Sequence, residues 1–153
     1  MSPEINTILA NSYSLPKQFR DRMRHMIEHP PTYDVNCISA ALYIVGLTDM
    51  EMNAQERDIW PPNKILAEHT QIIRSSTTID TQAYAESDLI GFARPANGSV
   101  VHLAVPLQYD HLVVERPSVN LPLQIWQLQS SFVFQTESLQ QPLTIKYFKL
   151  FTN

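Results

Sequence analysis

Glycine and cysteine are scarce in this sequence, and both shortages exclude classes of site. The chain has three glycines among 153 residues, at Gly46, Gly91 and Gly98. Glycine-rich phosphate-binding loops need several glycines within about eight residues, so nucleotide-binding folds of the two common glycine-rich types are excluded. The one cysteine cannot form an intrachain disulfide. No apolar run approaches the roughly 20 residues that span a bilayer.

Positive charge is also in short supply. Eleven Lys and Arg stand against 15 Asp and Glu, for a net charge of −4, so we expect no nucleic-acid partner. The length predicts one soluble domain over residues 1–153 with a substantial core. An acidic residue near the start occupies a region that a secretory signal would make positive. We therefore expect a cytoplasmic protein, or one exported by a specialised system without a conventional signal peptide.

The first half of the chain predicts helices. Residues 15–29 carry one apolar stripe among charged residues, which is typical of an amphipathic helix. Residues 33–47 form the most apolar run, and this pattern predicts a buried helix that is capped by Asp34 or Asn36 and closed at Gly46. The stripe of the first helix consists of Phe19, Met23, Met26 and Ile27.

The second half predicts strands. Between the two parts, residues 63–73 could form a short helix and the polar run 75–82 a loop. The β-branched and aromatic runs that follow predict an antiparallel meander. Helices followed by strands indicate an α+β fold. The four predicted strands are 87–95, 99–107, 111–117 and 144–151.

Cys37 falls in the first turn of the predicted buried helix. Backbone N–H groups at a helix N-terminus favour a thiolate and can donate to an oxyanion during acyl transfer. The alternative interpretation is a small buried hydrophobic residue, which is the commoner role of a single cysteine.

Of the five histidines, His102 alone sits in the middle of a predicted strand. Alternation puts Leu103 and Val105 on the core face and His102 on the other face, next to the small Ala104. An imidazole held on a strand in this way could act as the general base for a thiol. The alternative is a half-exposed histidine bonded to a neighbour.

We expect no metal and no cofactor. His25 and His29 have the spacing of a zinc site on a helix, but Met26 stands where a zinc peptidase has Glu. Both histidines are predicted to lie on the surface. Trp60 and Trp126 are expected to line the core or a groove.

The motifs YDVNCISAALYIVGL, ESDLIGFARP and VVHLAVPLQYDHLVVERP follow one another between Tyr33 and Pro117, and IKYFK follows near the end. In order and spacing they resemble the NlpC-type papain-like cysteine peptidase and amidase superfamily. The resemblance implies a papain-like α+β fold, with N-terminal helices and the Cys-bearing helix packed on a C-terminal antiparallel sheet. It also implies a cysteine hydrolase that forms a thioester acyl-enzyme.

Carried over by residue, the resemblance makes Cys37 the nucleophile and His102 the base. The third residue, which orients the imidazole, comes from HLVVERP. Glu115 is the best positional match, and His111 is the competitor on the same face. The alternative role of Glu115 is an edge-strand charge paired with Arg116 or a lysine.

The sequence around Cys37 departs from the cell-wall members, which have Asp before the Cys and Ser-Gly after it. Here these positions are Asn36, Ile38 and Ser39, so a peptidoglycan stem peptide is not the expected substrate. Asp34 could supply the missing carboxylate or cap the helix. Asn36 and Tyr33 are candidates for contact with the substrate or the oxyanion.

The expected substrate is therefore a peptide, an isopeptide or an acyl group, and hydrolysis cannot be separated from acyl transfer by residues alone. An acyltransferase would use the same thioester. A papain-like binding module with an inert Cys37 is the alternative from a different functional class.

Overall fold

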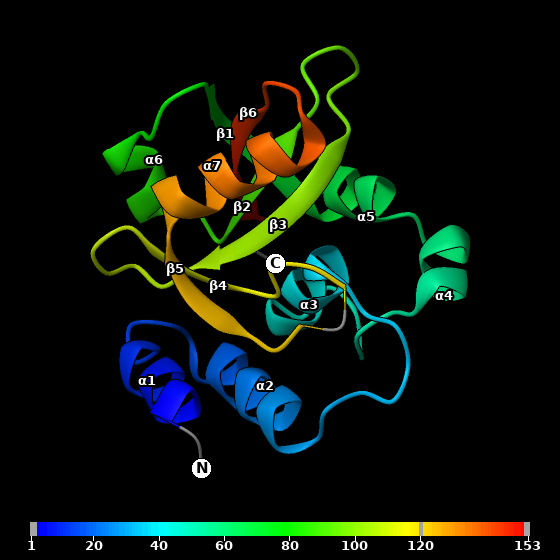
Figure 1. Ribbon diagram of the computed structural model, residues 1–153, viewed down its shortest axis with the longest axis vertical. Coiled ribbons are helices and arrows are strands. Elements are labelled where there is room, and N and C mark those ends of the chain that lie inside the picture. The colour runs from blue at the N-terminus through cyan, green and yellow to red at the C-terminus, as the bar shows by residue number, and fades with distance from the viewer. Residues whose placement is uncertain (1–2, 120, 152–153) are drawn as a thin grey trace.

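The computed structural model describes residues 3–119 and 121–151 (Figure 1). Thirteen elements lie in these two segments, seven helices and six strands. In chain order they are α1 (Pro3–Asn11), α2 (Lys17–Glu28), α3 (Cys37–Ile44), α4 (Ala54–Ile59), α5 (Pro62–His69), β1 (Thr70–Ser76), α6 (Thr81–Glu86), β2 (Leu89–Ala93), β3 (Val100–Pro106), β4 (Leu112–Glu115), β5 (Gln124–Gln127), α7 (Leu128–Leu139) and β6 (Thr144–Leu150).

The six strands form one sheet in the order β1-β6-β2-β3-β4-β5, and every neighbouring pair is antiparallel. The mixed α+β class is therefore confirmed, and all four predicted strands are present. The prediction of a simple meander was wrong, because β6 inserts between β1 and β2 instead of extending the far edge. Two further strands, β1 and β5, were not predicted.

Both faces of the sheet are covered. One core lies between the sheet and the N-terminal helices, with Met23 of α2 and Leu42 of α3 against Leu103 and Val105 of β3. The second core lies on the opposite face, where Leu128 of α7 packs with buried residues of the sheet. These sheet residues include Ile90, Phe92, Ala104, Val113 and Ile145. Strand β3 is consequently buried on both sides, and Figure 1 shows α7 lying across the strands.

Helix α3 begins and ends as predicted. Of the two proposed caps, Asn36 performs the role: its side chain accepts from the Ser39 amide, while the Ser39 hydroxyl accepts from the Asn36 amide. At the other end, Gly46 has a φ of +84°, a left-handed conformation that glycine adopts without a steric penalty. A Cβ at this position would come within 2.7 Å of Arg22 Nη1.

The middle of the chain was predicted less well. The proposed helix over 63–73 ends at His69, where β1 begins, and the run 75–82 contains the end of β1 and the start of α6. Helix α7 lies between two predicted strands, where the sequence pattern predicts no element. Its outer face exposes Val133 and Phe134, which blurs the amphipathic pattern that would have revealed it.

None of the helices in the described part of the chain is both long enough and apolar enough to cross a membrane.

Candidate active site

Cys37 is the first residue of α3, and 8% of it is exposed. The capping box engages the amides of Asn36 and Ser39 on either side of it, and the Cys37 amide takes part in neither bond. The thiol therefore lies at the positive end of a helix dipole, with its own backbone N–H beside it. Helix α3 contacts β3 and β4, the strands that carry the other two candidates.

His102 is fully buried in the middle of β3. The half-exposed strand histidine considered from the sequence is wrong, because α7 and the second core cover this face of the sheet. Phe92, directly opposite on β2, stacks on the imidazole with ring centres 5.2 Å apart and planes 14° apart. Phe132 of α7 then packs edge-on against Phe92. The stack fixes the plane of the imidazole from one side.

Glu115 is the last residue of β4, directly after the register pair Val105–Val114. Its side chain is 1% exposed, and its Oε2 lies against Nε2 of His102. The edge-strand pairing considered for Glu115 is wrong, because β5 covers that edge and Arg116 has a different partner. His111, the competitor, sits in the β3–β4 turn with a φ of +56° and packs edge-on against Tyr84.

The His102–Glu115 contact is a tight ion pair without regular hydrogen-bond geometry. Within the described residues, neither ring nitrogen and neither carboxylate oxygen has a regular hydrogen-bond partner. Because Nε2 faces Glu115, Nδ1 is the nitrogen left for the thiol. The ion pair thus leaves hydrogen-bonding capacity of both side chains unused within the described protein.

The electrostatics of His102 couple it to both partners. Burial lowers the pKa of His102, but the negative charge and hydrogen-bonding capacity of Cys37, followed by those of Glu115, outweigh burial and raise the pKa to about 10. The imidazole is consequently protonated at neutral pH.

The candidates for contact with the substrate or the oxyanion lie just before the N-terminus of α3. Tyr33 donates its hydroxyl proton to the Glu51 carbonyl at 2.9 Å, so this proton is engaged with the backbone. Burial first, and then the Glu51 and Glu56 carboxylates, raise the pKa of Tyr33. Asp34 does not cap the helix and lies 3.5 Å from Arg57 instead. The side-chain oxygen of Asn36 is used in capping, which leaves its NH₂ group on the side away from the cap bond.

A second buried ion pair adjoins the first, and sequence reasoning missed it. Arg116 donates from Nε and Nη2 to both carboxylate oxygens of Glu51, at 2.8 and 2.6 Å, and from Nη1 to the Leu121 carbonyl at 2.8 Å. Both side chains are about 5% exposed. Glu51 lies in the part of the chain with no readable periodicity, so no local signal marked it as the partner of Arg116.

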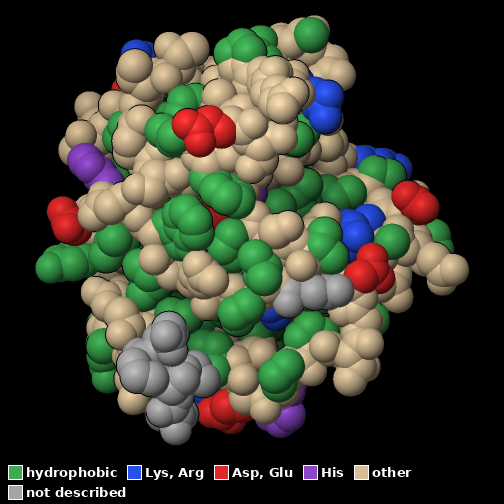
Figure 2. All heavy atoms as spheres, viewed as in Figure 1, with side chains coloured by type: hydrophobic (Ala, Val, Ile, Leu, Met, Phe, Trp, Pro, Cys, Tyr) green, Lys and Arg blue, Asp and Glu red, His purple; other side chains and the backbone are tan. Residues whose placement is uncertain are grey.

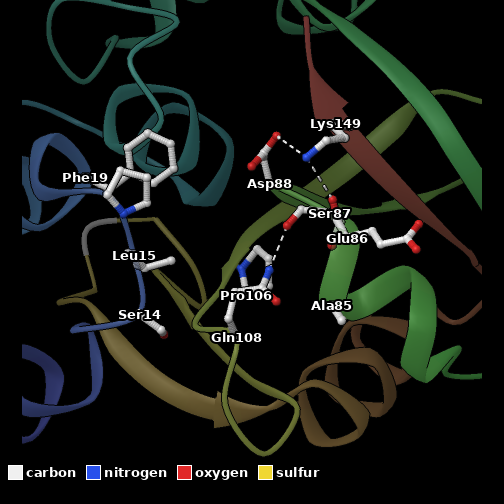
Figure 3. Close-up of a pocket in the computed structure, with 11 residues that line it drawn as sticks. Ser14, Leu15, Phe19, Ala85, Glu86, Ser87, Asp88, Pro106, Gln108 and Lys149 are labelled. Atoms are coloured by element: carbon white, nitrogen blue, oxygen red, sulfur yellow. Dashed lines mark hydrogen bonds and ion pairs between the residues drawn. The ribbon is translucent and has the colours of Figure 1, made fainter. Parts of the chain in front are cut away.

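A pocket of about 330 Å³ lies away from these groups (Figure 3). Leu15 and Phe19 line one side of it, and the ion pair of Asp88 and Lys149, 3.8 Å apart, lies on the other. Its lining includes none of Cys37, His102 or Glu115. The pocket therefore does not belong to the constellation around the thiol.

The remaining histidines and tryptophans do not join the site. His25 on α2 and His29, the residue after the helix, are both exposed, as predicted, and stack on each other with ring centres 4.6 Å apart. Trp60 is 64% exposed, whereas Trp126 packs against the second core. Over the described stretches of chain, no three His, Cys, Asp or Glu side chains gather closely enough to hold a metal ion.

Comparison of the chain with protein-family models, with curated proteins and with solved structures gives no match.

Proposed function

We propose that this protein is a cysteine hydrolase of the peptidase and amidase type, with Cys37 as nucleophile, His102 as general acid and base, and Glu115 as the orienting carboxylate. One observation carries the proposal: a thiol and a carboxylate meet around one buried imidazole, although 65 residues separate Cys37 from His102 in the sequence. A structural cysteine needs neither a helix N-terminus nor a charged imidazole beside it.

The reaction follows from the charges. The Cys37 thiolate attacks the carbonyl carbon, and the Cys37 amide and the Asn36 NH₂ group donate to the oxyanion. As the carbon–nitrogen or carbon–oxygen bond breaks, the His102 imidazolium gives its proton to the leaving group, which leaves a thioester. The neutral imidazole then deprotonates a water molecule that attacks the thioester. The acid departs, and the thiolate and imidazolium are restored.

Glu115 has a positioning role in this scheme. Its carboxylate faces Nε2 and leaves Nδ1 for the thiol, as a buried carboxylate does for the histidine of a catalytic triad. The stacked Phe92 ring restricts rotation of the imidazole in the same sense.

At the level of fold, we propose a papain-like arrangement. The support is the order of elements: a helix that begins at the cysteine, then an antiparallel β2–β3–β4 sequence with the histidine on its second strand and the acid on its third. The contacts of α3 with β3 and β4 are consistent with a Cys-bearing helix packed on the sheet.

The second candidate function is a binding module with an inert thiol. The low exposure of Cys37 and the complete burial of His102 favour it, since a substrate carbonyl has to reach the sulfur. The two functions differ in one measurable property, the reactivity of Cys37 in the folded protein.

The deciding experiment is the pH dependence of Cys37 alkylation by iodoacetamide, followed by mass spectrometry. We expect the parent to react well below the free-thiol value of about 8.5, and the His102→Gln variant to react only near that value. His111→Asn is the matched control, because this histidine lies at the turn and its loss should leave the profile unchanged. Labelling that begins only when the protein unfolds would rule out the enzyme and favour the module.

A further inference from the structure

The pocket that lies away from Cys37 is enclosed by segments that are far apart in the sequence. Its lining comes from the α1–α2 connection, α2, the end of α6 with the α6–β2 connection, the end of β3 with the following turn, and β6. Its volume of about 330 Å³ lies at the lower end of the range for small-molecule sites. The pocket therefore has the size for one small organic molecule.

Hydrogen bonds between these segments fix the shape of the pocket. Ser14 of the α1–α2 connection donates its hydroxyl proton to the Leu107 carbonyl, just after β3. The Gln108 side chain donates to the Tyr84 and Ser87 carbonyls, at 3.2 and 2.8 Å, and so ties the β3–β4 turn to α6 and the residue after it. The backbone of Gln108 has a φ of +62°, a left-handed conformation that is uncommon for a residue other than glycine. Since such a conformation persists only where the surrounding structure holds it, the walls of the pocket are preformed.

One wall of the pocket carries two opposite charges that do not saturate each other. Asp88 is fixed by β6: its amide donates to the Phe148 carbonyl and its Oδ2 accepts from the Leu150 amide, both at 2.8 Å. Its Oδ1 is left for a ligand. Lys149 donates to the Glu86 carbonyl at 3.3 Å, but its Nζ lies 3.8 Å from Asp88 Oδ2, which is too far for a hydrogen bond. The wall therefore presents a carboxylate oxygen and ammonium protons side by side.

The facing wall is apolar. Figure 3 shows Leu15 and Phe19 across the pocket from Asp88 and Lys149. The side chains of the ion pair are 28% and 46% exposed, and an exposed pair of this kind contributes little to stability. A ligand that offers each partner a charge of its own therefore gives up little when it separates them.

We propose that this pocket binds a free α-amino acid with an apolar side chain. The ligand carboxylate accepts from Lys149, the ligand ammonium donates to Asp88 Oδ1, and the ligand side chain packs on Leu15 and Phe19. Because the two protein charges are 3.8 Å apart, the two ligand charges have to stand on neighbouring groups, as they do on the α-carbon of an amino acid. A peptide carries its ammonium and its carboxylate at opposite ends. The pocket takes no part in the thiol chemistry, so its ligand does not depend on the hydrolase function.

The test is titration of the isotope-labelled full chain with L-leucine, followed by two-dimensional NMR of the backbone amides. We expect saturable shifts at Ser87, Gln108 and Lys149, which line the pocket. Glycine should bind at least about tenfold more weakly, because it has no side chain for the apolar wall. Removal of either ligand charge should cost at least about tenfold as well. The probes for this are 4-methylpentanoate, which is leucine without its ammonium, and 3-methylbutylamine, which is leucine without its carboxylate.

Two substitutions assign the charges one at a time. Lys149→Met should weaken L-leucine binding at least about tenfold without weakening that of 3-methylbutylamine, which has no carboxylate. Asp88→Asn should weaken L-leucine binding to a similar extent without weakening that of 4-methylpentanoate, and the asparagine oxygen can still accept from the Leu150 amide. Lys64→Met is the matched control. Lys64 forms an exposed ion pair with Glu68 at 3.9 Å and does not line the pocket, so its loss should leave L-leucine binding unchanged.

Several results would overturn the assignment. Absence of shifts up to the solubility limit of L-leucine would show that the pocket does not bind this class of molecule. Equal affinity for L-leucine and for either single-charge probe would remove the need for a zwitterion, and equal affinity for glycine would remove the apolar wall. Binding that persists in Lys149→Met and in Asp88→Asn would lie elsewhere on the protein. The alkylation of Cys37 is measured separately, so the hydrolase stands or falls on its own result.

Discussion

Two buried ion pairs begin at consecutive residues, Glu115 and Arg116, and they differ in how completely they are satisfied. Arg116 makes three regular hydrogen bonds, two of them to Glu51. Glu115 meets His102 without regular hydrogen-bond geometry, and the nitrogens and oxygens of that pair have no regular partner elsewhere in the described chain. A saturated pair is suited to holding structure, whereas an unsaturated pair retains capacity for a third group. The difference is the one expected if Arg116 supports the fold and Glu115 serves the proposed reaction.

The largest effect is expected from breaking the saturated pair on one side. Arg116→Met leaves the Glu51 carboxylate buried without a partner, and this should destabilise the fold by about 3–5 kcal/mol. Urea unfolding measures the loss. In the Arg116→Met/Glu51→Met double variant no buried charge remains, so most of the stability should return. If the double variant were as unstable as the single one, packing and not charge would explain the effect.

A smaller effect, on reactivity, is expected from neutralising the unsaturated pair. Glu115→Gln preserves the shape of the side chain and removes the charge that supports the imidazolium. The thiol then reverts toward ordinary behaviour, with a few per cent thiolate at neutral pH, and alkylation at pH 7 should slow about tenfold. Glu137→Gln, which removes an exposed carboxylate on α7, should leave the rate unchanged. An equal rate in both variants would contradict the positioning role of Glu115.

The sequence predicted those parts of the molecule in which local pattern and burial agree. Helix α3 is an example: the apolar run, the Asn36 cap and Gly46 all indicate the same element. The structure brings Cys37, His102 and Glu115 together, and the roles proposed for them are those that the resemblance to the NlpC-type superfamily implies. Alternation placed His102 on the correct face of β3, but the half-exposed position considered for it was wrong. That expectation treated one face of the sheet as exposed to solvent, but α7 covers this face and buries His102.

The contacts that no local pattern encodes could not be predicted. Glu51 and Arg116 are 65 residues apart in the sequence, and nothing in either neighbourhood identifies the other as its partner. The insertion of β6 between β1 and β2 could not be predicted either, because the alternation of apolar residues is the same for every possible strand order. Long-range pairing is decided by the packing of the whole core, and single-sequence patterns report only on neighbours along the chain.

The smallest expected effect, taken per pH unit, is the change in the free energy of unfolding that arises from His102. Its pKa is about 10 in the folded protein against an ordinary value of 6.5, so the folded state holds the proton more tightly. The stabilisation is fully present below about pH 6.5 and is lost as the pH rises through about 10, with a slope of at most about 1.4 kcal/mol per pH unit. Below the free-thiol value of about 8.5 the unfolded chain holds on Cys37 the one proton that the folded pair holds on His102, so urea unfolding should show this decline in the parent between about pH 8.5 and 10 and lose it in His102→Gln. The Cys37→Ala variant reports how much of the decline depends on the thiol, and parallel curves for parent and His102→Gln would show that the imidazole is not held as an imidazolium.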